Sequence, residues 1–250
     1  MLLSNGNILF AHQYGITLIN RDKRVLWKYD TPDGFETHTA QPIGKDHIVF
    51  VQNGNPAKVF VMNTKTNTVV KDFAIPFNSG THGQIRHARL TKEGTLLIAH
   101  MDLGNVNEYD FEGKILSSIA VPGVWSAQQL PSGNILVASN NRFVKELDRS
   151  GEVVWEYPLD DVKDYKLSNP QIAMRLPNGN TLINNWFNQW DGKLQSGNEP
   201  VQAVEVTKDK KIVWALRSWT NPVNLGPSTT FQLLKDPNGI TEHVHFGGIR

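Results

Sequence analysis

The sequence contains no cysteine, which excludes disulfides and thiolate metal sites. Its 250 residues carry a net charge of only +1, so we expect no nucleic-acid partner. No apolar run reaches the length of a membrane-spanning helix, and we expect no membrane insertion. The absence of thiols suits an exported protein as well as a cytosolic one, and Met1–Asn5 is too short and polar for a signal peptide. The location is therefore open, with a secreted or periplasmic one favoured.

A sustained helical period is also missing, and in its place one cassette recurs five times. Each copy has a polar strand, a tight turn ending in Gly or Asp, an apolar strand, and a further strand ending in an acidic or amide residue. The turn positions are separated by 40, 48, 39 and 46 residues, which is the length of a four-stranded propeller blade. These positions are Gly6, Asp46, Gly94, Gly133 and Gly179.

The fold class predicted from this repeat is all-β, a β-propeller of four-stranded blades that forms one domain over residues 1–250. Five blades are favoured, with the ring closed by a C-terminal strand over residues 229–235 (TTFQLLK). A sixth blade is the alternative, because residues 236–248 could begin another hairpin. Three copies place a tryptophan at matching positions of the expected outer strand: Trp27, Trp155 and Trp214.

The turns of the form LPxGN and the strands of the form DxxGxxxW resemble those of PQQ-like and arylsulfotransferase-like propellers. The resemblance covers nearly the whole chain and implies a propeller with WD40-like radial repeats. Its motifs are structural, so it implies a fold and not a reaction. It does not bring the site for PQQ itself, and no cofactor is expected.

Polar residues recur on the strand before each turn. In propellers this first strand of each blade lines the central channel, so we expect a ring of amides and guanidiniums there. Such a ring would bind an anionic or hydroxyl-rich ligand, because arginine forks bind carboxylate, sulfate and phosphate at two points. The alternative is that these groups bond to neighbouring strands and to channel water. Aligning the copies on their turns places four residues at one equivalent position: Gln41, Arg89, Gln129 and Arg175.

Histidines are concentrated in or beside the second and third copies: His38, His82, His87 and His100. The segment IRHARLTKEGTLLIAHMDLGN resembles the arylsulfotransferase segment in which a histidine precedes Ala-Arg-Leu. The resemblance implies that His87 is the nucleophile for a sulfuryl group and that Arg89 stabilises negative charge. Structural or channel-lining histidines are the alternative. The family's further histidine and asparagine positions are occupied here by Thr39, Ala127 and Ala173.

A metal site is a third alternative, since His38, His82 and His87 would supply three neutral imidazoles if adjacent blades present them to one mouth. His243 and His245 have the i, i+2 spacing that points both rings to one face of a strand. The first set lacks the regular spacing of a dedicated ligand motif, and the second has a better local geometry for chelation but lies near a terminus. No metal ligand is therefore predicted.

A long insertion in the fifth copy, residues 184–200, is rich in Asn, Gln and Gly and carries Trp186 and Trp190. Loops on a rigid scaffold collect binding groups, and aromatic rings beside amides suit stacking on a sugar. The alternative is that the rings fill the gap between adjacent blades.

These features favour a non-catalytic binding module for a polar or anionic small ligand, a glycan or a protein partner. The alternative is an enzyme, either a lyase or a sulfuryl transferase, that acts on a polyanionic or sulfated substrate through His87 and Arg89. No G-x-S-x-G elbow, P-loop or dinucleotide fingerprint indicates another class. The candidate ligand-binding residues are His38, Gln41, His82, Gln129, Arg175, Trp186 and Trp190.

Overall fold

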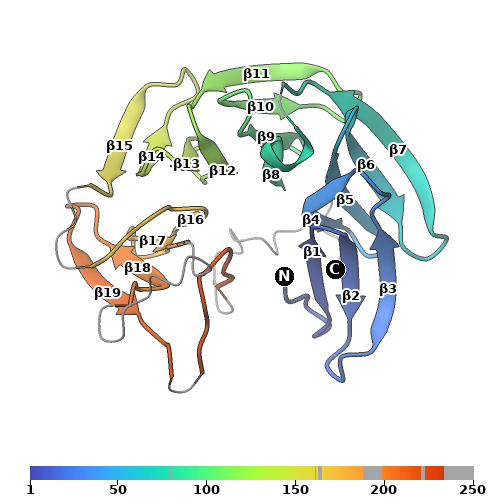
Figure 1. Ribbon diagram of the computed structural model, residues 1–250. Coiled ribbons are helices and arrows are strands. Elements are labelled where there is room, and N and C mark those ends of the chain that lie inside the picture. Colours follow the sequence, from blue (N-terminus) through green and yellow to red (C-terminus); the bar gives the residue numbers. More distant parts are fainter. Residues whose placement is uncertain (79, 161, 163–164, 188–198, 221–222, 234–250) are drawn as a thin grey trace. The chain divides into compact units, whose positions relative to one another are not determined.

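The computed structural model describes the chain except residues 79, 161, 163–164, 188–198, 221–222 and 234–250. The described residues form five antiparallel sheets and one short helix, which confirms the all-β, five-bladed propeller class (Figure 1). They group into two compact units, residues 1–122 and 123–233, and each unit consists of whole blades. The prediction of a single domain stays a prediction.

The first unit contains three blades whose strands follow one another along the chain. Blade 1 consists of β1 (Ile8–His12), β2 (Gly15–Ile19) and β3 (Val25–Asp30). Blade 2 consists of β4 (Glu36–Ile43), β5 (His47–Asn53), β6 (Ala57–Asn63) and β7 (Thr68–Ile75). Blade 3 consists of β8 (Ile85–Leu90), β9 (Leu96–His100), β10 (Asn105–Tyr109) and β11 (Ile115–Ala120).

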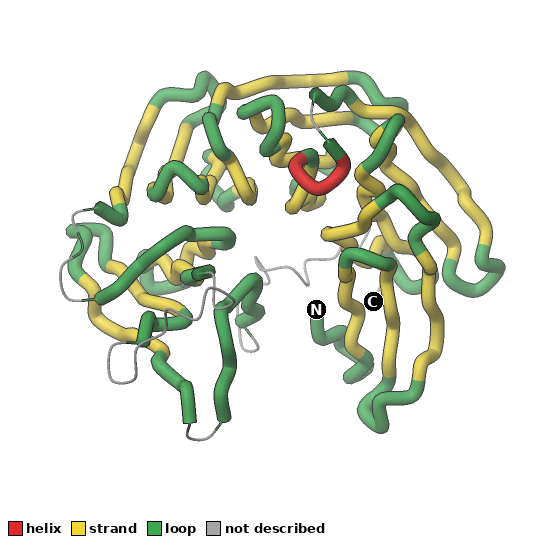
Figure 2. The backbone as a smooth tube through the Cα atoms, in the orientation of Figure 1, coloured by secondary structure: helices red, strands yellow, loops and turns green. Residues whose placement is uncertain are grey.

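A single 3₁₀ turn, η1 (Thr81–Gly83), connects blade 2 to blade 3 and is drawn red in Figure 2. Among the described residues no helix has the length and apolar character needed to cross a membrane. The second unit contains two blades. Blade 4 consists of β12 (Val124–Gln129), β13 (Ile135–Ser139), β14 (Phe143–Leu147) and β15 (Val153–Pro158). Blade 5 consists of β16 (Ala173–Arg175), β17 (Thr181–Asn184), β18 (Ala203–Val206) and β19 (Ile212–Leu216).

Blade 1 is a sheet of three strands, whereas the other blades have four. Beyond β1, Leu2 forms an isolated bridge with Ile8, so the first residues of the chain begin the missing strand. The strand predicted to complete this blade covers residues 229–235. Residues 229–233 form no strand, and 234–235 lie outside the described residues, as does the segment considered for a sixth blade.

Two kinds of turn explain why the cassette repeats. At the first, the N–H of the turn glycine bonds to the carbonyl oxygen three residues earlier, as in Gly133 to Leu130 at 2.9 Å. At the second, an Asp or Asn side chain accepts bonds from backbone N–H groups two and four residues later, as Asp148 does from Ser150 and Glu152. Both are local turn chemistry, and for this reason they are visible in sequence.

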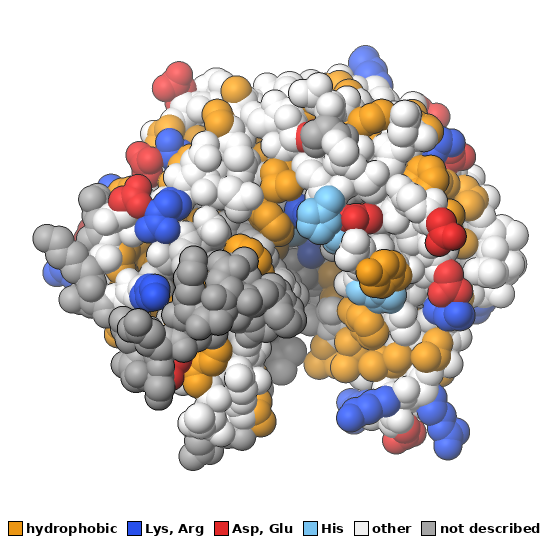
Figure 3. All heavy atoms as spheres, in the orientation of Figure 1, with side chains coloured by type: hydrophobic (Ala, Val, Ile, Leu, Met, Phe, Trp, Pro, Cys, Tyr) orange, Lys and Arg blue, Asp and Glu red, His pale blue; other side chains and the backbone are white. Residues whose placement is uncertain are grey.

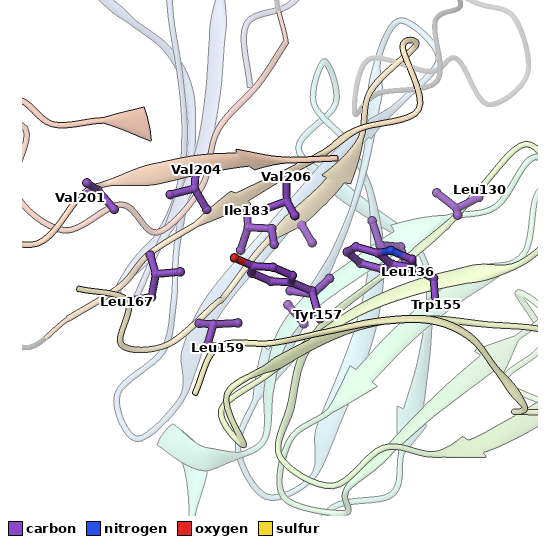
Figure 4. Packing of buried hydrophobic residues seen from close by; sticks show 13 residues of the cluster. Leu130, Leu136, Trp155, Tyr157, Leu159, Leu167, Ile183, Val201, Val204 and Val206 are labelled. Carbon is purple, nitrogen blue, oxygen red and sulfur yellow. The ribbon is translucent and has the colours of Figure 1, made fainter. Parts of the chain in front are cut away.

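The outer-strand tryptophans of blades 1 and 4 each reach the turn between the last two strands of the next blade. Trp27 Nε1 donates to Asn67 Oδ1 at 3.1 Å, and Trp155 Nε1 donates to the Lys208 carbonyl at 2.9 Å. Trp155 also packs among the buried apolar side chains shared by blades 4 and 5 (Figure 4). Each of these rings buries apolar area, and its N–H donates a hydrogen bond to the next blade. Trp27 and Trp155 therefore bind one blade to the next.

Blade 3 has a free edge at β8, and side chains of blade 2 bind it. Thr39 Oγ1 accepts from the Ala88 N–H at 3.2 Å, Gln41 Oε1 accepts from the Leu90 N–H at 2.9 Å, and Asn53 Nδ2 donates to the Ile85 carbonyl at 2.9 Å. An unsatisfied buried backbone group costs about 1–3 kcal/mol. These three bonds therefore fix the register of blade 2 against β8.

The glycine turns give a test of the repeat. Gly133 has φ +91°, and a Cβ there would meet no atom within 4 Å, so Gly133→Ala changes only the backbone preference. We expect a loss of about 1–2 kcal/mol in the free energy of unfolding, measured with urea. Gly80→Ala is the matched control, because Gly80 has φ −58° and equally open space. An equal loss in both variants would contradict the assignment of Gly133 to a turn position that requires a positive φ.

A buried histidine makes stability depend on pH. His100 is fully buried on β9, and its Nε2 lies 2.9 Å from the Tyr109 hydroxyl. Burial lowers the pKa of His100 to about 4, although Asp102 and the backbone of Pro76 act in the opposite sense. The unfolded chain, with a histidine pKa of about 6.5, therefore binds more protons than the folded chain between these two values.

We predict that the free energy of unfolding falls as the pH is lowered from about 6.5 to about 4, by at most about 1.4 kcal/mol per pH unit for this residue. His100→Gln should reduce that slope in urea titrations at a series of pH values. His12→Gln, at an exposed position, is the control and should keep the wild-type slope. An unchanged slope in His100→Gln would show that the decline arises elsewhere.

Candidate functional site

Two β-bulges direct side chains into a polar cluster in the first unit. In β4, Thr37 pairs with Gln52 and Thr39 with Val51, so His38 is an extra residue. In β8, Arg86 is the extra residue for the same reason. A bulge re-aims the side chain of the extra residue, and bulges of this kind are frequent beside functional sites. Because β4 and β8 are adjacent, the two re-aimed side chains meet: Arg86 Nη1 lies 2.9 Å from His38 Nδ1.

Glu36 is the centre of this cluster. Its Oε2 lies 2.7 Å from His38 Nε2 and 2.9 Å from His82 Nδ1, and its Oε1 accepts a 2.8 Å hydrogen bond from the Gln13 side chain. The two imidazole rings meet edge to face, with their centroids 5.7 Å apart. Segments from blade 1, blade 2 and the η1 connection thus converge on one carboxylate. We call Glu36, His38, His82 and Arg86 the Glu36 cluster.

The charges in the Glu36 cluster are balanced. Partial burial raises the pKa of Glu36, but the hydrogen bonds from His38 and His82 outweigh it and the pKa is lowered overall. Burial, followed by the charge of Arg86, lowers the pKa of His38 to about 4, so this ring is neutral at pH 7. Arg86 Nη1 lies near both ring nitrogens of His38, at 2.9 Å from Nδ1 and 2.7 Å from Nε2, so the tautomer of the neutral ring sets which nitrogen accepts from Arg86.

The Glu36 cluster is open to solvent on one side. The side chains of Glu36 and His38 are 14% exposed, whereas that of His82 is 71% exposed. Figure 3 shows histidine side chains next to an acidic one on the visible face, beside the position of η1 in Figure 2. The Arg86 side chain is also fixed at its other terminal nitrogen, since Nη2 donates to the His82 carbonyl at 2.5 Å. Among Glu36, His38 and His82, it is therefore His82 whose side chain is most exposed to solvent.

The structure brings together two of the sequence-predicted site residues, His38 and His82. His87 is buried on β8, opposite Ala99. Gln41 is also buried, and its side chain bonds to the backbone of β8 as described above. Arg89 donates from Nη1 to Thr39 Oγ1 at 2.9 Å and to the Ala88 carbonyl at 2.7 Å.

The predicted residues of the second unit have different surroundings. Arg175 Nη2 lies 2.8 Å from Glu146 Oε2, and its guanidinium stacks on the Trp155 ring at 4.9 Å. Gln129 is partly exposed on β12. Trp186 is partly exposed and forms an isolated bridge with Asn169. Trp190, His243 and His245 lie outside the described residues.

The predicted equivalence of Gln129 and Arg175 with Arg89 is wrong. The turn of blade 3 closes between Thr91 and Thr95, and that of blade 4 closes between Leu130 and Asn134. Leu130 therefore corresponds to Thr91 and not to Leu90, because the two turns have the same length and differ only in where a leucine stands. The true equivalents of Arg89 are Gln128 and Met174, while Ala127 and Ala173 correspond to Ala88.

Sequence reasoning missed Glu36 and Arg86. Glu36 and His38 have the i, i+2 spacing that would place them on one face of a regular strand, and this signal was present in the sequence. Arg86 carried no comparable signal, because its direction depends on the bulge in β8. The ligand-competent group found among the described residues consists of Glu36, His38 and His82, with all ligand atoms within 4.8 Å of one another. His87, considered earlier as a ligand, is not in this group.

Comparison with known proteins supports the fold. No family model and no curated protein matches the sequence. A crystal structure of a protein of unknown function from Bacteroides caccae matches with 26% identity and a TM-score of 0.73, over 85% of this chain and 78% of that chain. The WD40 β-propeller domain of Doa1 matches with 13% identity and a TM-score of 0.58, over 72% of this chain and 58% of that chain.

A lyase is also among the structural matches. It is a catalytically inactive histidine-to-alanine variant of virginiamycin B lyase from Staphylococcus aureus, crystallised with quinupristin. Identity is 15% and the TM-score 0.61, over 88% of this chain and 69% of that chain. At this identity the match shows a shared β-propeller fold. None of these three matches is a PQQ-like or arylsulfotransferase-like protein, so that resemblance stays a prediction.

The central role of Glu36 can be tested by stability. Glu36→Ala removes the acceptor shared by Gln13, His38 and His82, and we expect the free energy of unfolding to fall by about 1–3 kcal/mol in urea titrations. Glu112→Ala is the matched control, because the Glu112 side chain is 78% exposed and forms a surface ion pair with Lys71. Its cost should stay below about 0.5 kcal/mol. Equal costs would mean that the Glu36 network contributes nothing beyond a surface pair.

Proposed function

We propose that the protein is a β-propeller binding module that takes a small polar ligand at the Glu36 cluster. The observation that supports this proposal is the convergence of His38, Arg86 and His82 on one half-buried carboxylate, with two of these groups aimed by β-bulges. A few convergent polar groups on a rigid scaffold are typical of ligand sites. His82, which is the exposed member, would make the first contact.

The charge balance favours a hydroxyl-bearing ligand over a strongly anionic one. Glu36 is ionised at neutral pH and would repel a carboxylate or sulfate. Both terminal nitrogens of Arg86 are already engaged, one by the His38 ring and one by the His82 carbonyl. Two-point binding of an anion by this guanidinium would break those bonds. A sugar or polyol instead offers hydroxyl donors to Glu36 and to Nε2 of His82.

A second candidate function is elimination by a general base. The Glu36 carboxylate orients His82 through Nδ1 at 2.9 Å, which leaves Nε2 on the exposed ring as a base. The virginiamycin B lyase match supports this candidate through its fold. Sulfuryl transfer through His87 and Arg89 has weaker support, since His87 is buried and Arg89 bonds to Thr39 and to the backbone.

A thermal-shift panel tests the binding function. The purified protein is heated with neutral sugars, polyols, sugar acids and sulfated sugars, all in EDTA so that free divalent metal does not contribute. A ligand at about 100 times its dissociation constant adds about 2.7 kcal/mol of stability. We expect a shift with a hydroxyl-rich compound, and we expect His82→Ala to abolish it.

Gln129→Ala is the control for this panel, because Gln129 was predicted from sequence but lies in the second unit. It should keep the wild-type shift. The proposal fails if no compound in the panel gives a shift. It also fails if a shift survives in His82→Ala and disappears in Gln129→Ala.

A further inference from the structure

The same cluster contains the donor set of a transition-metal site. Glu36, His38 and His82 each offer one ligand atom, and these atoms lie within 4.8 Å of one another. Two imidazoles and one carboxylate are a set that zinc sites use when they keep a fourth position open. We propose that the Glu36 cluster binds one divalent ion of the zinc, cobalt or nickel class through Glu36 Oε2, His38 Nε2 and His82 Nδ1.

The distances are close to those that such an ion needs. In a tetrahedral site with metal–ligand bonds of about 2.0–2.1 Å, neighbouring ligand atoms are about 3.3 Å apart. Glu36 Oε2 lies 2.7 Å from His38 Nε2 and 2.9 Å from His82 Nδ1. The ligand atoms therefore need to separate by about half an ångström, a movement on the scale of side-chain adjustment. His82, on the exposed η1 connection, is the ligand that can move.

Coordination sets a requirement on the two rings, because an imidazole binds a metal ion through a nitrogen that carries no proton. A proton on His38 must then lie on Nδ1, and the guanidinium of Arg86, whose Nη1 is 2.9 Å from that nitrogen, must turn away when the ion binds. Glu36 is ionised and supplies the one negative charge of the donor set.

The charge of the surroundings selects among cations. Arg86 Nη1 lies 2.7 Å from His38 Nε2, so its positive charge opposes any cation and offsets the charge of Glu36. Magnesium and calcium rely on several oxygen ligands, and calcium takes six to eight of them. Zinc, cobalt and nickel form strong bonds to imidazole nitrogen and depend less on net charge. The Glu36 cluster therefore favours these ions over magnesium and calcium.

This inference deepens the proposed function, since it uses the same residues, but its test uses the metal alone. Untagged full-length protein is stripped with EDTA and titrated with zinc chloride in a calorimeter, and cobalt chloride is followed by visible absorption. We expect one ion per chain, d–d absorption from cobalt, and no binding heat with magnesium or calcium. His82→Ala should weaken zinc binding at least tenfold, and because His82 is 71% exposed this variant should fold.

The control is the double variant His243→Ala, His245→Ala, which removes the other histidine pair noted in the sequence. It should bind zinc as the wild type does. The inference is overturned if the wild type binds no zinc, or if His82→Ala binds it normally while the double variant does not. A sugar shift in EDTA without zinc binding would overturn the metal site and leave the proposed function standing. Zinc binding without a thermal shift from any compound in the panel would overturn the proposed function and leave the metal site standing.

Discussion

The candidate site depends on how the free edge of β8 is satisfied. Its backbone groups are bound by Thr39, Gln41 and Asn53, three side chains of the preceding blade. These bonds fix blade 2 against blade 3 in one register, because each misplaced bond would leave a buried polar group without a partner. That register is also what brings the two bulge residues, His38 and Arg86, within hydrogen-bonding distance.

The Glu36 cluster is a compact example of charge regulation by burial. One carboxylate carries the negative charge, one guanidinium carries the positive charge, and burial keeps His38 neutral between them. A neutral imidazole has one donor and one acceptor nitrogen, and in His38 these face Glu36 and Arg86, so a polar ligand or a metal ion at His38 would replace one of these contacts. Both proposed roles therefore depend on the burial of the same residue, His38.

The parts of the fold that follow from local chemistry could be predicted from the sequence. The glycine turns and the side-chain-capped turns each use residues a few positions apart, and their repeats gave five blades. The first strands of the blades were harder to align with one another from the sequence. The Leu-Pro turns carry their leucine at the position that Thr91 occupies in blade 3, and matching this leucine to Leu90 shifted the alignment of Gln129 and Arg175 by one position. A shift of one residue in a strand reverses the face of every side chain.

The site itself could be predicted only in part. His38 and His82 were visible as histidines in adjacent copies, and the structure brings them together. Arg86 joins them because β8 contains a bulge, which inserts one residue without a distinctive sequence signal. Glu36 precedes the bulge in β4, and its i, i+2 spacing to His38 was its one sequence signal. Long-range register, and not residue type, was the missing information.

The central claim is that the two bulge residues, His38 and Arg86, and η1 form a binding centre together with Glu36. The most direct measurement is a crystal structure of the protein soaked in zinc, with anomalous diffraction recorded on both sides of the zinc edge. The account predicts one anomalous peak bonded to Glu36, His38 and His82, at about 2.0–2.2 Å from the three ligand atoms. No peak there, or a peak held only by His243 and His245, would contradict it.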